Sequence, residues 1–259
     1  MRLRHGLESI VIIVAIAQGS TALADGINLS WNDCGVAGTR AAHFGCETND
    51  GPPYELFVSF SPPVGLEEVI GISATIDFYP SGRDAPAVPN WWRIGAEECR
   101  TSKALQASAD FERGPYTCES PYWGTNVNLG QQISHDGYRT RLIMTATWDE
   151  STPFVPDRQV EYYAFRIRVA RTSTVGASAC AGCELPVCIL ARDVQIYQPF
   201  RFAYDPLISN PRDRQIASWH NAGLTLSDFQ GVYPNWSCSP GQTVSARPVT
   251  WGRIKSLYR

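Results

Sequence analysis

The eight cysteines constrain what this chain can fold into more than any other feature of its sequence. They follow an N-terminal stretch with the anatomy of an export signal: two early arginines, an apolar run from Ile10 to Ala17, and Ala22-Leu23-Ala24. We therefore expect residues 1–24 to be a cleaved signal peptide and the rest of the chain to be secreted, at the cell surface or in a periplasm. In such oxidising surroundings an even number of cysteines predicts disulfides.

The sequence favours four disulfides but does not fix how the cysteines pair. Pairing the first four with their nearest neighbours, and favouring short closures among the last four, gives Cys34–Cys46, Cys99–Cys118, Cys183–Cys188 and Cys180–Cys238. The alternative is a zinc site, because the Cys180-x-x-Cys183 spacing with Cys188 and Cys238 could supply four thiolates. Export and the even count favour the disulfides, so we expect no metal and no cofactor.

Alternating apolar and polar residues predict several strands that each have one buried and one wet face. Turn-forming residues separate these segments. The clearest strands are expected at 54–60, 70–79, 141–148, 162–169 and 187–197, with weaker ones at 27–31, 104–111 and 243–246. Repeated one-sided strands favour an all-β fold, an antiparallel β-sandwich of the jelly-roll or immunoglobulin-like kind with long disulfide-stapled loops.

The mature chain, residues 25–259, is expected to form one sandwich domain. Residues 205–242 carry several prolines and almost no alternation, which predicts an irregular loop region with a short helix near 213–220. Residues 250–259 end the chain with Trp251, Ile254, Leu257 and Tyr258 among basic residues. A segment this apolar is expected to dock, either on its own sandwich or on another copy or an extracellular partner.

Aromatic residues in two loops are the best candidates for ligand binding. Trp91 and Trp92 precede Arg93 after a proline-rich bend, and Tyr122 and Trp123 follow Cys118. Exposed rings of this kind can stack on sugars, and adjacent tryptophans on a strand cannot both face inward, so at least one is expected to be exposed or at a junction. The alternative is that these rings close the ends of the core.

The sequence offers little for catalysis. It has no nucleophile elbow and no nucleotide-binding glycine loop, and the three histidines of the mature chain lack the i+3 or i+4 spacing of a helical metal pair. Paired carboxylates could hydrolyse glycosides, and the acids near aromatic residues are Asp77, Asp110, Asp149 and Glu161. Asp77 is expected on the wet face of its strand.

Charge and hydropathy exclude two classes of partner. The formal net charge is −3, whereas a nucleic-acid binder needs a basic face. After the signal, no apolar stretch is long enough to span a membrane.

Three segments carry a resemblance: Asn32-Asp33-Cys34-Gly35; Cys180-Ala181-Gly182-Cys183 with Pro186-Val187-Cys188; and Trp251 to Arg259. Together they resemble a group of uncharacterised secreted bacterial proteins. The resemblance implies export from a bacterium and a disulfide-braced β fold, and it brings no functional residue. We therefore expect a secreted, non-catalytic structural or interaction module. A carbohydrate-binding protein is the alternative and a glycoside hydrolase the third hypothesis.

Overall fold

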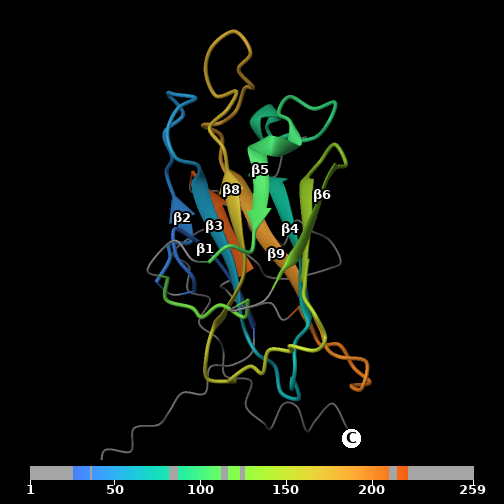
Figure 1. The fold of residues 1–259 in the computed structure, drawn as a ribbon. Helices are drawn as coiled ribbons and strands as arrows, with labels where there is room; N and C mark the ends of the chain where they lie inside the picture. Colours follow the sequence, from blue (N-terminus) through green and yellow to red (C-terminus); the bar gives the residue numbers. More distant parts are fainter. Residues whose placement is uncertain are drawn as a thin grey trace, which may run out of the picture.

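Two β-sheets form the described part of the chain, as Figure 1 shows. The computed structural model describes residues 26–35, 37–81, 87–111, 116–122, 126–209 and 215–220. Strands far apart in the sequence lie side by side in both sheets. The predicted β-sandwich is confirmed.

The smaller sheet has the strand order β1-β3-β8-β5, and all of its pairs are antiparallel. Its strands are β1 (Gly26–Trp31), β3 (Tyr54–Ser61), β8 (Tyr162–Val169) and β5 (Leu105–Ser108). A short 3-10 turn, η2 (Ser102–Ala104), leads into β5. Every strand of this sheet lies within or close to a segment that the alternation predicted.

The larger sheet has the order β2-β11-β9-β4-β7-β6, with β10 paired to β9. Its strands are β2 (Ala41–Ala42), β11 (Ile216–Trp219), β9 (Val187–Tyr197), β4 (Gly71–Pro80), β7 (Thr140–Thr147), β6 (Asn128–His135) and β10 (Leu207–Ile208). The pair β11–β2 is parallel, so the sheet is mixed. The short helix expected near 213–220 is wrong, because residues 216–219 pair with both β9 and β2 as strand β11.

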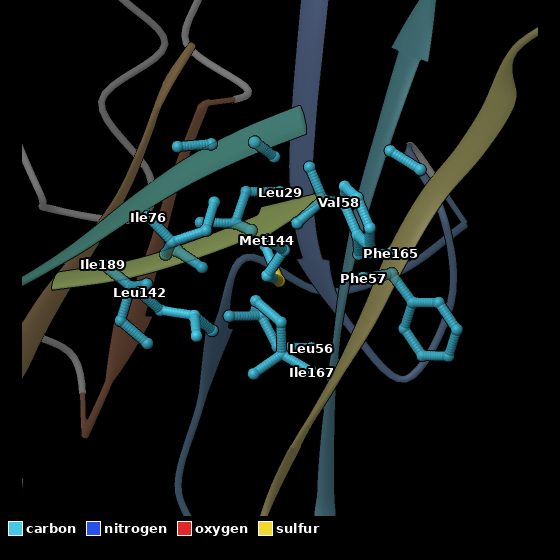
Figure 2. Packing of buried hydrophobic residues seen from close by; sticks show 14 of the residues in the cluster. Leu29, Leu56, Phe57, Val58, Ile76, Leu142, Met144, Phe165, Ile167 and Ile189 are labelled. Carbon is cyan, nitrogen blue, oxygen red and sulfur yellow. The ribbon is translucent and has the colours of Figure 1, made fainter. Parts of the chain in front are cut away.

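The core lies between the inner faces of the sheets (Figure 2). On β7, the inward residues Leu142 and Met144 are fully buried, whereas Ile143 between them is half-buried. Ile76 on β4 pairs with Leu142, and Leu56 on β3 pairs with Ile167 on β8. Complete burial of such a side chain stabilises the fold by about 1.5–3 kcal/mol.

The observed disulfides join loops that are distant in sequence. They are Cys34–Cys118, Cys46–Cys183 and Cys99–Cys180, with sequence separations of 84, 137 and 81 residues. All four predicted pairs are therefore wrong, because each includes a cysteine that is bonded to a different partner. Nearest-neighbour pairing fails here because the sandwich brings the ends of different strands together, and sequence distance then says little about spatial distance.

Disulfide bonding itself is confirmed for the described cysteines. Cys188 is also disulfide-bonded, and the chain's remaining cysteine, Cys238, lies outside the described residues. Since Cys180 and Cys183 are oxidised in two different disulfides, they cannot serve as the thiolate pair of the zinc site considered above. The three disulfides between described cysteines already indicate an oxidising compartment.

Several predictions fall on parts of the chain that the structure does not describe. Residues 1–24 and 250–259 are among them, so the signal peptide and the docking segment stay predictions. Within 205–242, the described residues contribute only β10 and β11. In the described ranges, no helix is long and apolar enough to cross a membrane.

Candidate functional site

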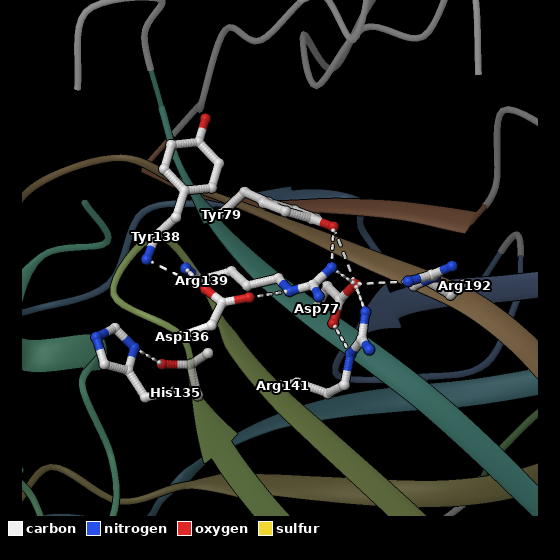
Figure 3. A network of polar contacts seen from close by, with 9 residues as sticks. Asp77, Tyr79, His135, Asp136, Tyr138, Arg139, Arg141 and Arg192 are labelled. Atoms are coloured by element: carbon white, nitrogen blue, oxygen red, sulfur yellow. Dashed lines mark hydrogen bonds and ion pairs between the residues drawn. The ribbon is translucent and has the colours of Figure 1, made fainter. Parts of the chain in front are cut away.

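A cluster of arginines converges on one buried carboxylate on the outer face of the larger sheet (Figure 3). Asp77 on β4 is completely buried, and β4 lies between β7 and β9. The β4–β7 register places Arg141 directly opposite Asp77. The Arg141 guanidinium donates from Nε to Asp77 Oδ1 at 2.6 Å and from Nη2 to Oδ2 at 2.8 Å. This two-point contact is the geometry that suits a guanidinium and a carboxylate best.

Two further arginines reach the same carboxylate. Arg139 Nη1 donates to Asp77 Oδ2 at 3.2 Å, and its Nε donates to Asp136 Oδ2 at 2.8 Å. Arg192 Nη1 lies 3.8 Å from Asp77 Oδ2, an ion pair without a hydrogen bond. We name Asp77, Asp136, Arg139, Arg141 and Arg192 the arginine cluster.

The β6–β7 hairpin turn sets the position of Arg139. The Asp136 carboxylate accepts hydrogen bonds from the backbone N–H groups of Tyr138 and Arg139, at 3.2 and 2.9 Å. Gly137, between Asp136 and Tyr138, has φ of +84°, a left-handed conformation that glycine adopts without strain. This tight turn directs Arg139 back over the sheet toward Asp77.

A β-bulge sets the position of Arg192. Thr75 pairs with Asp193 and Ile76 pairs with Ala191, so Arg192 is the extra residue in β9. Bulges re-aim side chains in this way. Because of the bulge, the side chain of Arg192 reaches Asp77 on the neighbouring strand β4.

Asp77 was expected on a wet face, and that expectation is wrong. The polar face of β4 is outward as predicted, but Arg139, Arg141 and Tyr79 cover the carboxylate. A buried carboxylate is tolerated because each of its oxygens is paired with a cation or a hydroxyl. The negative charge of Asp77 is thus neutralised by its partners.

The charge balance of the arginine cluster is positive. Three guanidinium groups face two carboxylates, so one positive charge is in excess. The pKa of the Arg141 guanidinium is raised, chiefly by its hydrogen bonds to Asp77, so its charge is secure. The arginine side chains retain 23 to 31% of their exposure, and Arg192 donates no hydrogen bond to a described residue. This set can receive an anionic group from solution.

The predicted aromatic site is not an exposed platform. Trp91 and Trp92 are both 0% exposed, so the expectation that one of them reaches the surface is wrong. They lie in a 3-10 turn, η1 (Asn90–Trp92), where the inward–outward alternation of a strand does not apply. Trp91 stacks on Trp219 and Trp92 on Phe78, with ring centroids 5.1 and 5.0 Å apart.

The other residues of that prediction are also engaged or lie elsewhere. Arg93 pairs with Glu98 at 2.8 Å. Tyr122 is buried, and its hydroxyl donates to the Ala164 carbonyl at 2.5 Å. Trp123 lies outside the described residues. Burial of three of these rings favours packing over sugar stacking.

The four candidate acids for glycoside hydrolysis lie in different surroundings. Asp77 belongs to the arginine cluster, whereas Asp110 faces Arg166 of the smaller sheet at 3.6 Å. Glu161 accepts hydrogen bonds from Asn28 and Ser59 at 2.6 and 2.5 Å. Asp149 lies in the β7–β8 connection, where it accepts the Ser151 backbone N–H. Their contacts neutralise or anchor them individually and do not favour an acid–base pair.

The comparisons with known proteins do not show a family. No protein-family model matches the chain, and no curated protein matches it. Among solved structures, the chain is similar to a cohesin module from a Clostridium perfringens ATCC13124 family 33 glycoside hydrolase. Sequence identity is 8%, the TM-score is 0.28, and the alignment covers 75% of this chain and 94% of that one. A TM-score this low carries no argument about function.

Proposed function

We propose that this chain is a secreted or cell-surface, non-catalytic interaction module that binds an anionic group of an extracellular polymer at the arginine cluster. The observation that carries the proposal is Arg192. Its guanidinium faces a fully buried carboxylate at 3.8 Å, yet donates no hydrogen bond to a described residue. Among the described residues, its guanidinium donors are therefore available to a ligand.

The neighbouring tyrosines support an acidic glycan as the ligand. Tyr138 is 40% exposed, and its ring lies 6.2 Å from that of Tyr79 beside Arg139. A partly exposed ring beside cationic forks suits a sugar that carries a carboxylate or sulfate. The carbohydrate-binding alternative is thereby moved from the buried tryptophans to the outer face of the larger sheet.

Binding assays with matched ligands test the proposal. We expect the mature chain to bind an acidic polysaccharide, such as polygalacturonate, and not a neutral one of similar length. Because the contact is ionic and partly exposed, raising the salt concentration should weaken it. Arg192→Gln should weaken binding about tenfold or more, since a charge-assisted hydrogen bond is worth about 1.5–3 kcal/mol.

Arg158→Gln is the matched control. Arg158 is exposed in the β7–β8 connection, so the substitution removes the same charge outside the cluster. Equal weakening by both variants would reduce the effect to net charge and refute a specific site. Binding of acidic peptides but not acidic glycans would keep the interaction module and reject the glycan.

A further inference from the structure

Two histidines from distant parts of the chain meet at one end of the parallel strand pair. Strand β11 pairs with β2 so that Ser218 lies opposite Ala41 and Trp219 opposite Ala42. His220 directly follows β11 and His43 directly follows β2. The His220 backbone N–H donates to the Ala42 carbonyl at 3.0 Å. In-register parallel strands place equivalent residues side by side, which explains the meeting of the two rings.

The two rings meet at their nitrogens. Nδ1 of His220 lies 3.4 Å from Nδ1 of His43, and the ring centroids are 5.6 Å apart. Two imidazole nitrogens this close need a proton or a cation between their lone pairs. Zinc–nitrogen bonds of about 2.05 Å at a tetrahedral angle also place two ligand nitrogens about 3.4 Å apart.

The surroundings favour a cation at this position. Burial, and then the neighbouring His43, lowers the pKa of His220. The carboxylates of Glu184 and Glu47 act in the opposite direction, so they lie close enough to offset the charge of a bound ion. His43, Glu47 and Glu184 are exposed, so solvent can fill further coordination positions.

The adjacent Cys46–Cys183 disulfide determines which ring nitrogen of His220 is available to a metal ion. Cys46 Sγ lies 3.7 Å from Nε2 of His220, and it is bonded to Cys183. An oxidised sulfur is not a thiolate ligand, and it occupies the Nε2 side of the ring. The Nδ1 side, which faces His43, is therefore the one through which His220 can ligate.

We propose that His43 and His220 form a two-histidine site for a divalent transition-metal ion, through Nδ1 of each ring and with water in the remaining positions. Imidazole ligands suit Zn²⁺ and Cu²⁺. Within the described ranges, no group of three or more His, Cys, Asp and Glu side chains is arranged to hold a metal. With two ligands among the described residues, the site should be weaker than a structural zinc site with four protein ligands.

Titration of the mature chain with Zn²⁺, followed by calorimetry, tests the proposal. We expect one ion per chain, with binding weakened about tenfold or more by His43→Gln or by His220→Asn, since each removes a direct ligand. Asparagine is chosen for position 220 because His220 has φ of +53°, which asparagine tolerates better than most residues. His135→Gln is the matched control, since His135 faces Thr140 in the β6–β7 hairpin.

A spectroscopic measurement distinguishes the loss of a metal ligand from the loss of folding. The Cu²⁺-loaded chain should show electron-spin coupling to two nitrogens, and each variant that melts like the parent should show one fewer. The proposal is overturned if Zn²⁺ does not bind at millimolar concentration, or if folded His43→Gln and His220→Asn chains bind as tightly as the parent. The anionic-ligand assay is independent, because the arginine cluster lies on β4, β7, β9 and the β6–β7 turn, and it includes neither His43 nor His220.

Discussion

The buried hydroxyl of Tyr79 contacts two residues of the arginine cluster. It donates to Asp77 Oδ2 at 2.9 Å and accepts from Arg139 Nη1 at 3.1 Å. Burial, followed by the negative charge of Asp77, raises the pKa of Tyr79 to about 12. Burial also raises the pKa of Tyr122 and of Tyr163 far above the ordinary value. Three tyrosines that resist ionisation in the folded state make the protein sensitive to alkali.

The sign of that sensitivity follows from linkage. The folded-state pKa is raised, so the stabilisation is fully present below the unfolded value of 10.0 and, for Tyr79, is lost as pH rises toward about 12. We expect the free energy of unfolding to fall by about 1.4 kcal/mol per pH unit for each of the three tyrosines above pH 10. Urea unfolding at several alkaline pH values measures it.

The Tyr79→Phe variant provides the control for this effect. Its stability should fall less steeply with pH than that of the parent chain, because one of the three groups no longer titrates. A parent chain whose stability is flat over this range would show that these hydroxyls ionise as easily in the folded state as in the unfolded one.

Strands could be predicted from the sequence where they are long enough to show alternation and one of their two faces is buried. Strands β4, β7 and β8 met that condition, with inward residues such as Ile76, Leu142 and Phe165. Strand β6 was missed because it is an edge strand with mostly exposed side chains, so no dry face marks it. Strand β11 was missed because four residues are too few for a pattern, and all four are buried.

The aromatic turn η1 shows why the loop tryptophans could not be placed. Trp91 and Trp92 pack against Trp219 of β11, a strand more than a hundred residues later. The guanidinium of Arg100 lies 3.7 Å above the Trp91 ring and closes the other side. The local sequence around Pro89 does not predict such distant packing partners.

The disulfide between the β2–β3 and β8–β9 connections should stabilise the edge of the larger sheet. Cys46–Cys183 closes a separation of 137 residues next to strand β11. We expect the double variant Cys46→Ala/Cys183→Ala to lose about 2–5 kcal/mol of unfolding free energy, measured with urea. Changing both cysteines avoids leaving a free thiol that could form a wrong disulfide.

The same measurement on Cys99→Ala/Cys180→Ala gives a comparison, since that disulfide closes 81 residues. If the Cys46/Cys183 variant is as stable as the parent, strand pairing and the rings of Trp31, Phe44 and Trp219 must hold this edge without the covalent link.

At the scale of the whole molecule, the arginine cluster is a product of register. Asp77 was expected on an outward face, but its pairing with Arg141 depends on β4 and β7 being neighbours in one particular register. Arg192 joins them only through a bulge in β9. The sequence therefore predicted the polar faces but not the site, because neither strand order nor the bulge can be read from alternation.

The C-terminal segment tests whether the molecule works alone or as an assembly. Residues 250–259 carry Trp251, Ile254, Leu257 and Tyr258, and exposing this much apolar surface in water is unfavourable. We expect deletion of these residues to lower the melting temperature of a monomer, because own-domain docking buries the segment without the entropic cost of association. Calorimetry combined with light scattering measures stability and mass together. If deletion instead dissolves an oligomer and leaves the monomer's melting temperature unchanged, the segment docks on another copy. If neither quantity changes, the docking prediction is wrong in both forms.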